Sequence, residues 1–390
     1  MIFRRLIFSF TIGLVFLVAQ ASHAQDIEYE TLDASSLNKL ADEGDAFAAY
    51  TLAFNALLDL DGKEVTISDQ EAILRLLERA DAMGDGDAAN MLGTIYAGNT
   101  FENIQIDMDR ARSAFKRGTQ RGSEGAILNY GVLLIQSENN SNHREGINLL
   151  ESILDSEVTG HIAAEFLLSV YMFGVGEIDA QFDKIESTAL RCVDVEHMEG
   201  HCSYIIARDK ENGWGQEEDP EGALIWYERS AKNGDERAQW IYGMALLNGE
   251  GLEQNSAEAF KWVKASADQG YIDGLISFAV MSATGDGTSV DSDAAFNAYD
   301  RAAKLGSAHA LRGLSAMLYS GEGRTANEEK GLAGLIIAMD RGDELSLQLI
   351  SHFLDISEEF ELLGEIQKKR DALAPFIEDI KASYAEAADQ

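Results

Sequence analysis

The chain has 390 residues and carries 31 Lys and Arg against 67 Asp and Glu, which gives a formal net charge of -36. So large an excess of acid repels nucleic acid and anionic membrane surfaces, which excludes binding to either. Because 46% of the residues are hydrophobic, the chain can bury a large core, and its acidity belongs to a solvated surface. Such a surface favours solubility, with attraction of a basic partner as the alternative.

Residues 1–24 have the three-part layout of a secretory signal peptide. Two arginines precede an uncharged apolar run over residues 6–18, and the small residues Ser22 and Ala24 stand where a signal peptidase reads. The run is shorter than the roughly 20 apolar residues that span a bilayer, although a membrane anchor is the alternative. We therefore predict cleavage after Ala24, a short linker over residues 25–36, and a mature chain outside the cytoplasm with no membrane span.

The mature chain is predicted to be all-helical. It contains only two prolines, Pro220 and Pro375, against 35 glycines in the whole sequence. Scarce proline together with frequent Ala, Leu, Glu and Arg favours helices that glycine separates. No run of alternating Val, Ile or Thr indicates a strand.

A glycine recurs at intervals of 34 to 40 residues and sets an internal repeat. Each of these glycines follows an amphipathic stretch, so we predict that it ends a helix in the left-handed conformation that glycine adopts readily. A Gly-x-Gly loop in several repeats, such as Gly249-Glu-Gly251, separates a first helix from a second one. The nine repeat glycines are Gly44, Gly84, Gly122, Gly160, Gly200, Gly234, Gly270, Gly306 and Gly342.

One repeat shows a family pattern most clearly. Its marker residues are Ala238, Tyr242-Gly243, Gly249-x-Gly251, Ala259-Phe260-x-Trp262 and Gly270. This pattern resembles the Sel1-like repeat, a relative of the tetratricopeptide repeat. The resemblance covers residues 37–357 and implies a right-handed α-solenoid of about nine antiparallel helix pairs that serves as a scaffold for protein complexes. The repeat after Gly200 departs from the pattern by a two-residue slip.

Residues 358–390 do not follow the repeat. Apolar residues at helical spacing stand on both sides of Pro375. We expect capping helices here, because the last repeat of a solenoid otherwise exposes its apolar face.

Cys192 and Cys202 are the two cysteines of the chain, and His197 and His201 lie between them. A single continuous helix would hold the cysteines roughly 15 Å apart, beyond disulfide reach, whereas a turn at Gly200 could bring them together. In an oxidising compartment we predict a disulfide between them. Free thiols and a metal site are the alternatives.

Enzyme motifs are incomplete in this sequence. Ser36-x-x-Lys39 and Ser113-x-x-Lys116 match a serine-lysine pattern, but the Ser-Asp-Asn and Lys-Thr-Gly elements that accompany it in enzymes are absent. The Gly-x-Gly loops lack the third glycine and the preceding strand of a dinucleotide site. We therefore expect no catalytic residue, no cofactor and no metal.

The sixth residue after the repeat glycine varies freely among aromatic, amide, aliphatic and cationic types. Its members are Tyr50, Asn90, Leu128, Phe166, Trp240, Ile276, Arg312 and Gln348. The resemblance implies that the first helix of each pair lines a concave surface, and aromatic and arginine side chains are common interface anchors. We predict that a partner binds to Tyr50, Asn90, Phe166, Trp240 and Arg312. Drift or irregular packing is the alternative.

The resulting functional hypothesis is a non-enzymatic scaffold or regulator of the bacterial cell envelope. The predicted signal peptide, together with the bacterial source that the resemblance implies, indicates a periplasmic location, and we expect a partner that is another envelope protein, bound through the concave face. The alternative is a hydrolase or binder that acts on cell-wall material of the peptidoglycan type.

Overall fold

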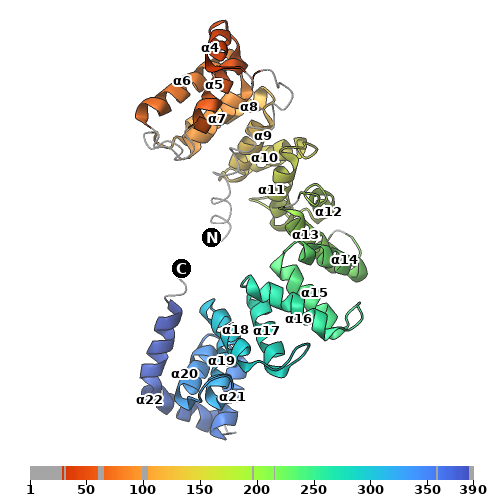
Figure 1. The fold of residues 1–390 in the computed structure, drawn as a ribbon, viewed down its shortest axis with the longest axis vertical. Coiled ribbons are helices and arrows are strands. Elements are labelled where there is room, and N and C mark those ends of the chain that lie inside the picture. The colour runs from red at the N-terminus through yellow and green to blue at the C-terminus, as the bar shows by residue number, and fades with distance from the viewer. Residues whose placement is uncertain are drawn as a thin grey trace. The chain divides into compact units, whose positions relative to one another are not determined.

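The computed structural model describes residues 29, 32–59, 66–98, 104–195, 197–214, 216–356 and 359–385 (Figure 1). The predicted signal peptide and its cleavage site lie outside these described residues. Within them the chain is helical, apart from turns, loops and one isolated bridge between Val175 and Ile178. No helix in the described ranges is both long and apolar enough to cross a membrane.

The described chain divides into two compact units. The N-terminal unit comprises the described residues up to Met198 together with Trp214 and Gln216, and the C-terminal unit comprises Glu199–Gly213 and the described residues from Glu217 onward. In each unit, helices that follow one another in the sequence pack against each other, which is the arrangement of a helical repeat protein.

Among the described residues from Leu32 onward, the first helix of the N-terminal unit is α4, and helix pairs follow it. Its helices are α4 (Ala34–Asp42), α5 (Ala46–Asp59), α6 (Ile67–Met83), α7 (Gly86–Ala97), α8 (Met108–Gln120), α9 (Glu124–Ile135), α10 (Asn140–Ser152) and α11 (Gly160–Phe173), followed by η1 (Phe182–Lys184) and α12 (Ile185–Ala189). Because α4 begins at Ala34, the predicted linker over residues 25–36 already contains the first turn of a helix.

The C-terminal unit is more regular. Its helices are α13 (Glu199–Asn212), α14 (Pro220–Lys232), α15 (Glu236–Asn248), α16 (Ser256–Asp268), α17 (Ile272–Thr284), α18 (Ser292–Lys304), α19 (Ala308–Ser320), α20 (Glu328–Asp340), α21 (Glu344–Leu354) and α22 (Glu359–Ala385). The helices with odd numbers from α5 to α21 each follow one of the repeat glycines or contain it in their first turn, and we call them first helices. The predicted all-helical solenoid is therefore confirmed.

Seven of the nine repeat glycines end a helix as predicted. Gly44, Gly84, Gly122, Gly234, Gly270, Gly306 and Gly342 have φ angles between 84° and 107°. This left-handed region is open to glycine and strained for other residues. The residue after the glycine often caps the next first helix, as where the Asp85 carboxylate accepts a hydrogen bond from the Ala88 amide at 2.7 Å.

For Gly160 and Gly200 the same prediction is wrong, because neither of them ends a helix. Gly160 is the first residue of α11, Gly200 lies in the first turn of α13, and neither has a positive φ. A Cβ atom on Gly160 would lie 2.5 Å from the Leu154 carbonyl oxygen, and one on Gly200 would lie 2.7 Å from the Asn233 carbonyl oxygen. These glycines allow two backbone segments to approach closely, which any side chain would prevent.

The C-terminal segment also differs from the expectation of separate capping helices. One helix, α22, runs from Glu359 to Ala385 with Pro375 inside it. Proline removes one hydrogen bond of the helix, but apolar residues on both sides of Pro375 pack into the same core. The helix lies against α20 and touches α18, so packing holds it together across the proline.

Candidate protein-binding surface

The sixth residues after the repeat glycines, which we call the variable column, are buried in the first two repeats. Tyr50, on α5, is 4% exposed, and its ring stacks between Phe47 and Phe54 at centroid distances of 6.1 and 6.0 Å. Asn90, on α7, is 3% exposed, and its Oδ1 atom accepts a hydrogen bond from Asn129 Nδ2 at 2.8 Å. Neither side chain presents much surface to a partner.

Phe166 is half-buried on α11, beside two groups with perturbed acidity. Burial raises the pKa of the Glu165 carboxyl. Burial lowers the pKa of His161, and the neighbouring His197, with its ring centroid 5.9 Å away, lowers it further. This part of α11 therefore favours uncharged side chains.

Trp240 and Arg312, in the C-terminal unit, are half-buried and contact the next first helix along the chain. Trp240, on α15, donates a hydrogen bond from Nε1 to Ser277 Oγ on α17 at 2.9 Å. The Nε atom of Arg312, on α19, lies 2.9 Å from Oδ2 of Asp343, the residue that caps α21, although it is not aligned for a hydrogen bond. These two members of the variable column therefore lie where consecutive repeats meet.

Tyr204 and Arg237 belong to the same surface, and the sequence analysis missed both. The Arg237 guanidinium lies 4.0 Å from the centroid of the Tyr204 ring, pairs with the Asp235 carboxylate at 2.5 Å, and lies 3.1 Å from His201 Nδ1. Tyr204 on α13 corresponds to Trp240 on α15 once the two-residue slip is taken into account. Aligning the small residue Ala207 with Gly243 would have revealed this register.

Four half-buried side chains thus form a group on α13, on α15 and at the N-cap of α17, which we call the aromatic-arginine cluster: Tyr204, Arg237, Trp240 and Tyr271. Trp240 and Tyr271 pack at a centroid distance of 5.9 Å with their rings tilted by 57°. Burial, the nearby Asp273 carboxylate and a hydrogen bond to it raise the pKa of Tyr271 to about 12. The cluster therefore presents neutral aromatic rings next to an arginine that its neighbours hold in place.

The histidines that border this cluster favour the neutral form. Burial, followed by the positive charge of Arg237, lowers the pKa of His201. Burial, followed by Arg312, also lowers the pKa of His309, whereas Asp343 and Asp273 oppose that shift. Since His309 interacts with charges on α17, α19 and α21, the first turns of these helices belong to one electrostatic surface.

Cys192 and Cys202 are fully buried, and both are disulfide-bonded. The sequence contains no third cysteine. Of the three states considered for these residues, the structure contains the disulfide. The described residues include no group of three His, Cys, Asp or Glu arranged to hold a metal ion.

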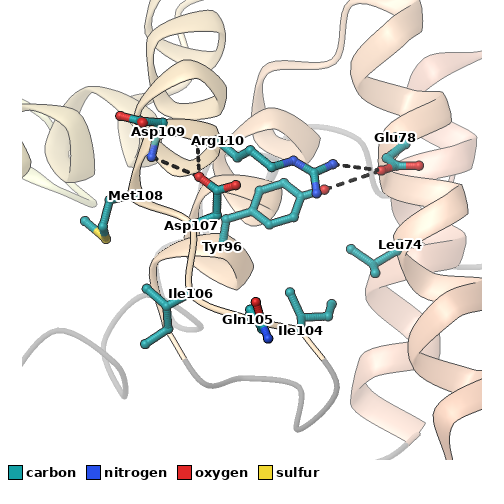
Figure 2. A pocket seen from close by; sticks show the side chains of 10 residues that line it. All are labelled: Leu74, Glu78, Tyr96, Ile104, Gln105, Ile106, Asp107, Met108, Asp109 and Arg110. Carbon is teal, nitrogen blue, oxygen red and sulfur yellow. Dashed lines mark hydrogen bonds and ion pairs between the residues drawn. The ribbon is translucent and has the colours of Figure 1, made fainter.

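An open pocket of 630 Å³ lies between α6, the start of α8 and the segment from Ile104 to Asp107 (Figure 2). Three of its polar side chains, Glu78, Tyr96 and Arg110, contact one another. The Tyr96 hydroxyl donates to Glu78 Oε1 at 3.3 Å, and the Arg110 guanidinium lies 4.2 Å from the Tyr96 ring centroid and 3.9 Å from Glu78 Oε1. Ser113, in the serine-lysine pattern near the pocket, donates a hydrogen bond from its hydroxyl to the Asp109 carbonyl.

Comparisons with known proteins agree with this architecture. The model of the Sel1 repeat matches residues 204–235, 236–271, 278–307 and 308–333, which span α13 to the first half of α20. The aromatic-arginine cluster lies within the first two of these matches. No curated protein matches the chain significantly.

Two solved structures are similar to this chain, and the first of them shares its fold. A Sel1 repeat protein from Oxalobacter formigenes is 20% identical, with 87% of this chain and 93% of that chain covered and a TM-score of 0.63. A protective antigen of uropathogenic Escherichia coli with an SLR fold is 17% identical, with 92% and 95% covered and a TM-score of 0.45. The repeat matches and the first structure define a helical repeat protein. The chain carries Sel1 repeats within residues 204–333.

Proposed function

We propose that this protein is a non-enzymatic scaffold or regulator that binds another protein through its first helices in the bacterial cell envelope. The observation that carries the proposal is the aromatic-arginine cluster, which is half-exposed although it lies in the most regular repeats. Trp, Tyr and Arg are the residue types that most often anchor protein interfaces.

The cluster is also ordered before any partner arrives. Asp235 and the Tyr204 ring fix the Arg237 guanidinium, and Ser277 fixes the Trp240 indole. A side chain that is already held in place loses less conformational entropy on binding. The cluster therefore suits recognition better than loose surface side chains would.

Two features support the location in the cell envelope. The sequence of residues 1–24 has the layout of a signal peptide, and the two cysteines of the chain are disulfide-bonded. Disulfides persist in oxidising compartments such as the periplasm and are rare in the cytosol.

Crosslinking in intact cells followed by mass spectrometry tests the proposal. Trp240→Ala should remove the crosslinked partner. Ile225→Ala is the matched control, because Ile225 is a large apolar residue that is 68% exposed on the second helix α14. Equal partner yields from the two variants would show that the cluster is not the binding surface.

A further inference from the structure

We propose that the aromatic-arginine cluster binds a basic segment of the partner protein, which places lysine or arginine side chains on the rings of Trp240 and Tyr271. The proposal rests on the proposed function and specifies the chemistry of the partner. The basis of the proposal is a difference between the charges on the surface of the first helices. The arginines are already paired with carboxylates, whereas several other carboxylates are not paired.

The cations of this surface are already paired. Arg237 pairs with Asp235 at 2.5 Å, and Arg312 pairs with Asp343 at 2.9 Å. The side chain of Asp235 is only 5% exposed and that of Asp343 is 11% exposed, so both carboxylates lie against their arginines. An acidic partner would have to compete with these carboxylates for the two guanidinium groups.

The acids of the same surface are in surplus. Glu236, Asp273 and Glu344 occupy the first turns of α15, α17 and α21. None of the three has an ion pair within the described part of the chain. Together with Asp235 and Asp343 they make five carboxylates against the two guanidinium groups of Arg237 and Arg312, a surplus of three negative charges. The neighbouring histidines do not offset this surplus, since their surroundings lower their pKa.

The rings of the cluster are suited to a cation. The position of Arg237 over Tyr204 shows that a guanidinium already packs on a ring face of this surface. Trp240 and Tyr271 keep part of their rings exposed, and among the described residues no cation lies over either ring. Trp is the side chain that binds cations best through its ring face. Lysine or arginine on these rings would also lie near the carboxylates of Glu236 and Asp273.

The charge of the whole chain supports the same partner. A net charge of -36 attracts a basic segment at long range and repels an acidic one, including a second copy of this chain. The basic segment is therefore expected from a different protein.

Fluorescence anisotropy with labelled oligo-arginine and oligo-glutamate peptides of equal length tests the inference on the full chain. We expect binding of oligo-arginine only, weaker at high salt because ions screen exposed charges. Trp240→Leu should weaken binding about tenfold, a change of about 1.4 kcal/mol, whereas Trp240→Phe, which keeps a ring, should lose less. Unchanged affinity in Trp240→Leu, with its helical content intact, would overturn the proposal.

Two double variants separate a local site from a general effect of charge. Glu236→Gln with Asp273→Asn removes two acids beside the cluster, and Glu250→Gln with Glu253→Gln removes two exposed acids from the loop after α15. Both change the net charge equally. We expect about tenfold weaker binding for the first pair and less than about twofold for the second. Equally weakened binding in the two double variants would show that only the net charge matters, which would overturn the inference.

The peptide experiment and the crosslinking experiment test the basic partner and the binding surface separately. If oligo-arginine does not bind but Trp240→Ala still removes the crosslinked partner from cells, the binding surface is correct and its basic partner is wrong. If oligo-arginine binds through Trp240 but the crosslinked partner persists in Trp240→Ala, the scaffold proposal fails at this surface.

Discussion

The two units use the same repeat position in different ways. In the first three repeats of the N-terminal unit the members of the variable column, Tyr50, Asn90 and Leu128, are buried, and Tyr50 stacks between two phenylalanines of its own helix. In the C-terminal unit Trp240 and Arg312 remain half-exposed and contact the first helix of the next repeat. A column that varies in sequence can therefore belong to the core in one repeat and to the surface in another.

The largest effect that we expect separates these two environments. Tyr50→Ala should reduce the free energy of unfolding by about 3 kcal/mol, because it leaves a cavity between Phe47 and Phe54. Trp240→Ala should cost about 1 to 2 kcal/mol, since the ring is only half-buried and loses one hydrogen bond. Urea unfolding followed by circular dichroism compares them. Equal losses would contradict the distinction between a buried and a half-exposed column.

The disulfide is the next largest expected contribution. Alkylation of the exported protein, denatured but not reduced, should leave Cys192 and Cys202 unlabelled. Reduction should lower the free energy of unfolding by about 2 to 3 kcal/mol, as for other bonds that close short loops. Two labelled thiols in unreduced protein would show that the bond does not form in the cell, and would leave the region after α12 without its crosslink.

Substitutions of the repeat glycines are expected to reduce the free energy of unfolding by about 1 kcal/mol. Gly306→Val should destabilise by that amount or more through backbone strain alone, because φ is 97° and no atom lies within 4 Å of a Cβ atom there. Gly306→Asn should cost less, since asparagine tolerates the left-handed region. At Gly160, Asn should be as damaging as Val, because any Cβ atom would approach the Leu154 carbonyl.

Lys304→Gln is the control for these glycine variants. It removes one exposed ion pair, with Asp300 at 2.7 Å, and should cost only a few tenths of a kcal/mol. Thermal melting of all five variants measures the differences. A melting temperature of Gly306→Val equal to that of Lys304→Gln would show that Gly306 is not a helix stop.

The smallest expected effect is a dependence on pH through His161. Burial lowers the pKa of this histidine in the folded state, so the unfolded chain binds a proton more readily. Stability should therefore fall as the pH drops below the unfolded pKa of about 6.5, and His161→Gln should reduce that fall. Urea midpoints between about pH 7.5 and pH 5.5 test this, and an identical pH dependence in the variant would contradict it.

The glycine stops could be predicted because a left-handed helix end depends on one residue and its own backbone. Gly160 and Gly200 could not be distinguished from them, since a close approach of two backbones selects the same residue type. Tyr204 was missed because the slip after Gly200 hides its register. The burial of Tyr50 depends on Phe47 and Phe54, which no repeat column fixes.

The measurement that tests the central claim most directly compares partner capture by Trp240→Ala and Tyr50→Ala at a temperature where both variants remain folded. Trp240→Ala should lose the partner at a small cost in stability, whereas Tyr50→Ala should keep the partner despite a larger loss of stability. Capture that persists in Trp240→Ala, or that declines in both variants in proportion to their lost stability, would contradict a binding surface on the first helices of the C-terminal unit.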